Sequence, residues 1–189
     1  MSLEYQRYGR NKNTLINSTY INSGEYRNKF DKITDNKSVN RILYAKAKEM
    51  LEHRSGTLLE DMYWIDGDTG RIIAKVLNET KEKGILYTNS ILKALEGEKN
   101  IITLHTHPNS MPPSAADFNS AVKNGYKQGL VICHNGKIFS YTANEEINER
   151  IYYLYIDEFM TDGESEYTAQ IKTLNRLMEN CDISFKEVD

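Results

Sequence analysis

The sequence predicts an α/β domain, because its apolar residues follow two different periods along the chain. They recur at helical spacing from Asp35 to Glu52, and again in two stripes that begin at Ile147. Between these segments, short apolar runs are separated by Gly, Asn and Asp, a pattern typical of strands joined in hairpins. A chain of 189 residues is long enough to form one domain with a substantial core.

The N-terminal segment, residues 1–35, is rich in Asn, Lys, Ser, Thr and Tyr and poor in aliphatic side chains. Such a segment either wraps the surface of a domain or is partly disordered, and its composition leaves both alternatives open. We therefore treat residues 1–35 as an extension and place the domain at residues 36–189. Residues 1–7 contain no apolar stretch of the kind found in secretory signals, so we expect no such signal.

The first half of the domain is expected to begin with a long amphipathic helix over residues 35–52. Two apolar runs, residues 57–65 and 71–77, flank a turn cluster that contains Asp-Gly and a second Gly, and they predict a hairpin. Residues 84–88 are a candidate short strand, and a helix should follow over residues 89–95.

The second half is expected to contain a strand from Asn100, a helix that starts at Ser114, a hairpin and a pair of helices. The hairpin has His134 in its turn, where we expect an exposed side chain. The helical pair should occupy residues 144–180, divide at Gly163 and pack on the core.

Composition excludes several classes of function. The formal net charge is −3 and the isoelectric point is near 5.9, which gives no electrostatic footprint for nucleic acid. No apolar run is long enough to cross a bilayer, so we expect no membrane association. Cys133 and Cys181 have neither metal-binding nor redox spacing, and two unpaired cysteines suggest a reducing cytoplasm.

The most informative motif is a pair of histidines followed by an aspartate. His105 and His107 end an apolar run, and residues two apart in a strand point to the same face. Asp117 lies in the first turn of the next predicted helix. Two imidazoles and one carboxylate are the ligand set of a catalytic zinc site that keeps a fourth position for water. The sequence therefore predicts a Zn²⁺ site that can activate water as a nucleophile.

A hydrolytic site of this kind also needs a general base, and a carboxylate is the usual choice. Glu60 is the best candidate, because a charge beside an apolar strand is poorly placed unless it faces a site. Glu52 and Asp61 are the other candidates. The alternative for Glu60 is that it is a strand residue that faces solvent and has no part in a site. Ser114 has two roles open to it: it can cap the helix, or its hydroxyl can stabilise the oxyanion of a substrate.

These residues resemble the JAMM metalloproteases, also called the MPN+ or JAB family. The family motif is an upstream Glu, then His-Ser/Thr-His-Pro, a short loop and Ser-x-x-Asp, which correspond here to Glu60, His105-Thr106-His107-Pro108 and Ser114-Ala115-Ala116-Asp117. The resemblance covers roughly residues 55–142. Six residues separate His107 from Ser114, where the family usually has seven.

The resemblance implies a curved mixed sheet flanked by helices, with layering similar to that of cytidine deaminases and with extra C-terminal helices. It implies zinc bound by His105, His107 and Asp117, with Glu60 as acid/base and Ser114 as oxyanion helper. The implied activity is hydrolysis of peptide or isopeptide bonds in a protein or peptide substrate.

Two other functions stay open at this point. Many domains of this family are non-catalytic interaction modules, and the flanking sequence is similar to modules of bacterial prophage proteins, which suggests a role in phage assembly. A role in DNA metabolism, by analogy with RadC-like proteins, agrees poorly with the acidic balance of the chain. The sequence does not predict the oligomeric state.

Overall fold

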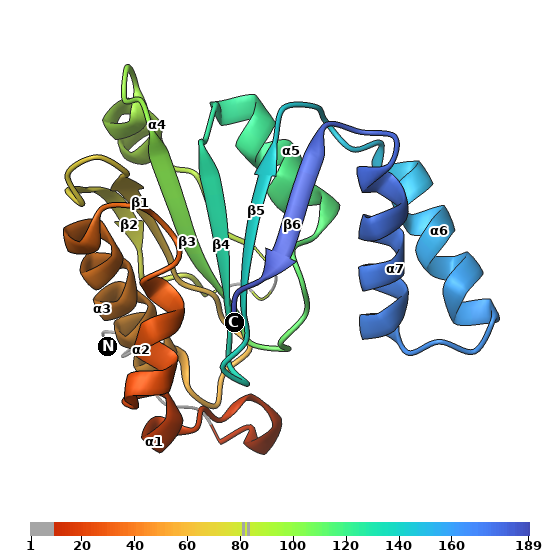
Figure 1. Cartoon of the computed structure of the whole chain (residues 1–189), viewed down its shortest axis with the longest axis horizontal. Coiled ribbons are helices and arrows are strands. Elements are labelled where there is room, and N and C mark those ends of the chain that lie inside the picture. The colour runs from red at the N-terminus through yellow and green to blue at the C-terminus, as the bar shows by residue number, and fades with distance from the viewer. Residues whose placement is uncertain (1–9, 81, 83) are drawn as a thin grey trace.

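The computed structural model describes residues 10–80, 82 and 84–189, and it has an α/β fold built on a six-stranded mixed sheet (Figure 1). The strand order is β2-β1-β3-β4-β5-β6. β3 and β4 are parallel, and every other neighbouring pair is antiparallel. The strands are β1 (Met62–Asp66), β2 (Ile72–Val76), β3 (Ile101–His107), β4 (Gln128–Cys133), β5 (Ile138–Ala143) and β6 (Ile183–Glu187).

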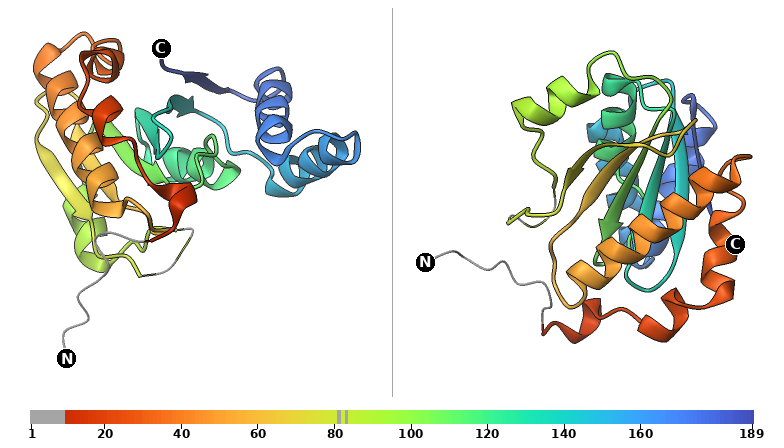
Figure 2. Two further views of the ribbon diagram at one scale, coloured as in Figure 1. Left: turned by 90° about the horizontal axis from the view of Figure 1, so that it is seen from below. Right: turned by 90° about the vertical axis from the view of Figure 1, so that its left-hand side faces the viewer.

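Helices lie on both sides of this sheet. α1, α2 and α3 cover one face, and α5 lies on the opposite face, with α6 and α7 at the β6 side (Figures 1 and 2). The helices are α1 (Ser18–Ile21), α2 (Gly24–Phe30), α3 (Lys37–Arg54), α4 (Asn89–Leu95), α5 (Ala115–Asn124), α6 (Glu149–Thr161) and α7 (Glu166–Met178), preceded by a 3₁₀ turn at Lys12–Thr14. No helix in the described ranges has the length and apolar character to pass through a bilayer.

The alternation of side chains along β3 divides the core into two layers. Ile102 and Leu104 are buried in the layer under α3, whereas Ile101 is buried in the layer under α5. Because side chains in a strand alternate between faces, His105 and His107 follow Ile101 onto the α5 face. The strand pattern thus places both imidazoles beside the first turn of α5.

Most of the predicted elements are confirmed. The long helix, both hairpins, the histidine-bearing strand and the helix after Ser114 are all present. α5 begins with a capping box between Ser114 and Asp117 and ends at Gly125, whose φ of 65° is a left-handed conformation that glycine adopts without strain. The C-terminal helices separate at Gly163 as expected.

Residues 84–88 form no strand, so that prediction was wrong. β2 remains the edge of the sheet, and the backbone N–H of Leu86 donates to the Glu79 side chain instead of to a neighbouring strand. Ile85 and Tyr87 pack against the core on the α5 face. The apolar side chains of this run therefore pack against the core, although its backbone does not pair with a strand.

The C-terminal region differs from the expectation in two ways. α7 buries Ala169, Leu174 and Leu177, but Tyr152 is the single buried side chain of α6, so α6 packs mainly on α7. After the helices, β6 returns to pair antiparallel with β5, a strand that the sequence pattern did not predict.

His134 is buried, which contradicts the expectation of an exposed turn residue. Its side chain is 2% exposed, and Nδ1 lies 2.6 Å from the carbonyl oxygen of Thr14. The cause is the N-terminal segment: residues 10–35 pass over this turn and bury Ile21, Tyr26 and Phe30 against the domain. Residues 1–9 of the predicted extension lie outside the described residues.

A buried ion pair joins the end of α3 to the residue that precedes β1. Arg54 and Asp61 are both fully buried, with Nε and Oδ1 2.5 Å apart, and the backbone N–H of Asp61 donates to Thr106 Oγ1. Asp61→Asn should leave the Arg54 charge without compensation. We expect chemical denaturation to show a loss of about 3–5 kcal/mol in the free energy of unfolding.

The control for Asp61→Asn is Glu158→Gln, which breaks the exposed pair between Glu158 and Arg176. We expect that substitution to cost at most about 1 kcal/mol, because exposed pairs are screened by solvent. Equal losses in the two variants would contradict the importance of the buried pair.

Candidate metal centre

His105 and His107 come from the end of β3, between β1 and β4. His105 pairs with Met62 of β1 and Val131 of β4, and His107 pairs with Cys133. Strands on both sides fix the backbone, so the two rings are held in place. Their Nε2 atoms lie 3.1 Å apart, and both residues are buried.

Asp117 reaches the same point from the first turn of α5. Its Oδ1 lies 3.2 Å from His105 Nε2, and its Oδ2 lies 3.7 Å from His107 Nε2. Among the described residues, these three form the one cluster of His, Cys, Asp or Glu with ligand atoms close enough to share an ion. The structure thus brings together all three predicted metal ligands.

The three side chains are close enough to share one ion. Ligand atoms about 2.0–2.2 Å from zinc would lie roughly 3.3–3.6 Å from one another. The two Nε2 atoms are 3.1 Å apart, the imidazoles approach different oxygens of Asp117, and one ligand atom from each residue lies within 4.8 Å of the other two. Two nitrogens and a carboxylate oxygen are also donors that Zn²⁺ prefers.

The loop between the ligands fixes the tautomer of His107. Its Nδ1 lies 2.9 Å from the carbonyl oxygen of Met111, which can only accept, so Nδ1 carries the hydrogen and Nε2 keeps its lone pair free. Gln170 of α7 donates to the carbonyls of Pro112 and Pro113 at 3.0 Å each. The six-residue loop is therefore held by a helix that lies outside the family motif.

Burial and the charges of the triad shift the pKa values of its three side chains. Burial opposes protonation of His105, but the Asp117 and Glu60 carboxylates together outweigh burial and raise the pKa of His105. Burial lowers the pKa of His107 to about 4. Burial alone would raise the pKa of Asp117, yet the two histidines hold it well below its usual range. The triad therefore favours an ionised carboxylate and a neutral His107, the forms that bind metal.

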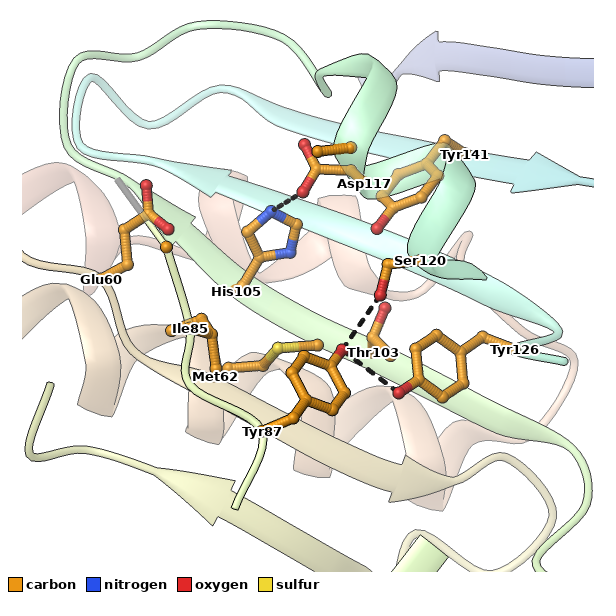
Figure 3. Close-up of a pocket in the computed structure, with 12 residues that line it drawn as sticks. Glu60, Met62, Ile85, Tyr87, Thr103, His105, Asp117, Ser120, Tyr126 and Tyr141 are labelled. Atoms are coloured by element: carbon orange, nitrogen blue, oxygen red, sulfur yellow. Dashed lines mark hydrogen bonds and ion pairs between the residues drawn. The ribbon is translucent and has the colours of Figure 1, made fainter. Parts of the chain in front are cut away.

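Glu60 precedes β1 and lines the same cavity as His105 and Asp117 (Figure 3). Burial and the nearby Asp117 carboxylate raise the pKa of Glu60 to about 7, with His105 acting in the opposite direction. A carboxyl group that titrates near neutral pH beside candidate metal ligands is suited to proton transfer.

The other two candidate bases lie away from the triad. Asp61 does not line the cavity and is held by Arg54 and by His53, whose Nδ1 is 2.6 Å away. Glu52 lies on α3 with its carboxylate 3.8 Å from Lys48. The structure places Glu60 alone of the three at the candidate metal centre.

Ser114 acts on Asp117. Its hydroxyl lies 2.8 Å from Asp117 Oδ2 and its backbone N–H donates to the same oxygen at 2.7 Å, as in a capping box. Ser114 also lines the outer groove of the site. In this arrangement, the hydroxyl orients a candidate metal ligand, and the oxyanion role would require it to turn from Asp117 toward a substrate.

Two cavities meet at Glu60 and Asp117. The outer groove, of about 700 Å³, runs along α6, and the inner cavity, of about 260 Å³, extends under residues 84–88. Hydroxyl groups of Tyr87, Tyr126 and Ser120 form a hydrogen-bonded chain in the inner cavity (Figure 3). The candidate centre is thus open to a ligand on two sides.

Sequence reasoning missed the residues that support this centre. Gln170, Tyr87 and Tyr152 reach the site from helices and loops far along the chain, and no local spacing connects them to the histidines. The cluster of Tyr152, Tyr153 and Tyr155 is the feature of the sequence that could have indicated an aromatic wall there.

No protein-family model, curated protein or solved structure matches the chain.

Proposed function

We propose that this chain is a zinc-dependent hydrolase of peptide or isopeptide bonds, of the JAMM type. The observation that supports this most is the convergence of His105, His107 and Asp117 with Glu60 around one cavity. A bound Zn²⁺ would supply Lewis acidity, polarising a carbonyl and lowering the pKa of water toward about 7. The mixed sheet with helices on both faces is the coarser part of the fold that the motif implies.

Each residue then has a defined task. His107 offers Nε2 because its Nδ1 hydrogen is held by the Met111 carbonyl, and Asp117 is oriented by Ser114. The Glu60 carboxylate takes a proton from water and returns it to the leaving amine, which its raised pKa favours. The substrate is a protein or peptide, and the groove of about 700 Å³ beside the triad has room for part of such a chain.

The experiment that tests this function measures metal and hydrolysis in one preparation. We expect elemental analysis to find about one zinc per chain. A panel of fluorogenic peptides and lysine isopeptides should include a substrate that is cleaved, and cleavage should stop on chelation and return with added zinc. A folded chain free of metal that cleaves nothing would favour the non-catalytic interaction module instead.

A further inference from the structure

The outer groove has one wall that does not belong to the family motif. Tyr153, Ile156 and Met160 lie on one face of α6 at helical spacing, and all three line the groove that contains Asp117. Tyr153 is 57% exposed and Met160 is 45% exposed. Large apolar side chains are thus presented to solvent next to the candidate metal centre, as expected of a binding surface.

The same groove has acidic side chains beyond the candidate metal centre, Asp157 and Glu166. Its lining includes Glu60, Asp117, Asp157 and Glu166, and it includes no Lys or Arg among the described residues. Asp157 and Glu166 make no ion pair within the described part of the chain, whereas the nearby Glu158 and Glu164 are paired with basic residues of α7.

A concave surface lined by charge of one sign concentrates ligands of the opposite sign. The inner cavity differs, because beyond the triad and Glu60 it is lined by hydroxyl and apolar groups. Selection by charge therefore belongs to the outer groove.

We infer that the outer groove binds an extended polypeptide segment that carries basic and apolar side chains, with Asp157 and Glu166 selecting the basic ones. This inference rests on the proposed function, since the occupant of the groove is then the substrate. The apolar stem of a Lys or Arg can cover Tyr153 and Met160 while its charged end reaches a carboxylate. The Tyr153 ring also offers a face for a cation.

The test measures binding without turnover, on the full chain carrying Glu60→Gln with its zinc content determined in the same sample. The probes are a fluorescein-labelled peptide of Gly, Leu and Lys and the same peptide with every Lys replaced by Gln. Fluorescence anisotropy should show tighter binding of the Lys peptide. Adding Asp157→Asn and Glu166→Gln should weaken its binding about three- to tenfold and leave the Gln peptide unaffected.

The matched control carries Glu149→Gln and Asp162→Asn, which remove the same charge from exposed positions at the two ends of α6 outside the groove. It should bind the Lys peptide as tightly as the parent does. Equal affinity for the two peptides, or equal weakening in both double variants, would overturn the inference.

The outcomes for groove and function are separable. If the chain holds zinc and cleaves substrates but binds the two peptides equally, the proposed function stands and the inference about the groove is wrong. If the chain binds the Lys peptide through Asp157 and Glu166 but holds no zinc, the groove is a site for cationic peptides and the proposed hydrolase function is wrong.

Discussion

Glu60→Gln is expected to keep the zinc content of the chain and to lower its hydrolytic rate by about 10²–10⁴-fold. The amide is nearly the same size as the carboxylate, so the cavity around His105 and Asp117 should keep its shape. It cannot accept a proton from water, and a positioned general base contributes a factor of this order. The measurement is kcat/KM on a cleaved fluorogenic substrate, with metal content determined for the same sample.

The control for this substitution is Glu52→Gln, on a carboxylate of the same type that lies away from the cavity on α3. It should change neither metal content nor rate. If Glu60→Gln retained full activity, Glu60 would have no part in the reaction, even if the zinc site were real.

The pH dependence gives a second readout of the same group. A general base works in its ionised form, and the pKa of Glu60 without metal is raised to about 7. The rate should therefore rise as the pH rises through the pKa of Glu60. A cation bound by the triad favours the ionised form of Glu60 and lowers its pKa. The rise of the rate with pH should therefore occur below pH 7 in the zinc-loaded chain. This pH-dependent rise should be absent in Glu60→Gln.

The local parts of the site could be predicted from sequence because they depend on short-range geometry. His105 and His107 share a face because a strand repeats every two residues, and Asp117 lies in the first turn of a helix that Ser114 caps. Glu60 was predicted from its poor fit to an apolar strand, and the antiparallel pairing of β1 with β3 brings it to the histidines.

The remaining features depend on contacts between distant segments. His134 is buried because Thr14 lies against it, and Gln170 reaches the ligand loop from α7. Residues 84–88 have an apolar pattern that suits a strand equally well, but the Leu86 N–H donates to the Glu79 side chain and Tyr87 packs against the core, so this run does not pair with β2. Short apolar runs are ambiguous for this reason.

Asp117→Ala is expected to abolish stoichiometric zinc binding and, with it, hydrolysis. Loss of a group that hydrogen-bonds to a metal ligand typically costs about 10- to 100-fold in metal affinity, so loss of a direct ligand should exceed about 100-fold. The same substitution removes the acceptor for the Ser114 N–H and thus a capping interaction of α5, worth about 1 kcal/mol of stability.

Asp117→Asn separates these two effects. The amide oxygen can still accept from the Ser114 N–H and keep the cap, but it is neutral and a much weaker ligand for zinc. We therefore expect Asp117→Asn to unfold near the parent's midpoint and still to lose zinc in a chelator competition. Asp157→Asn, which removes a carboxylate from the same groove, should keep the metal. With these results, zinc affinity would depend on the Asp117 carboxylate and not on the helix cap or the charge of the groove. Zinc retained by both Asp117 variants would show that the triad is not the metal site.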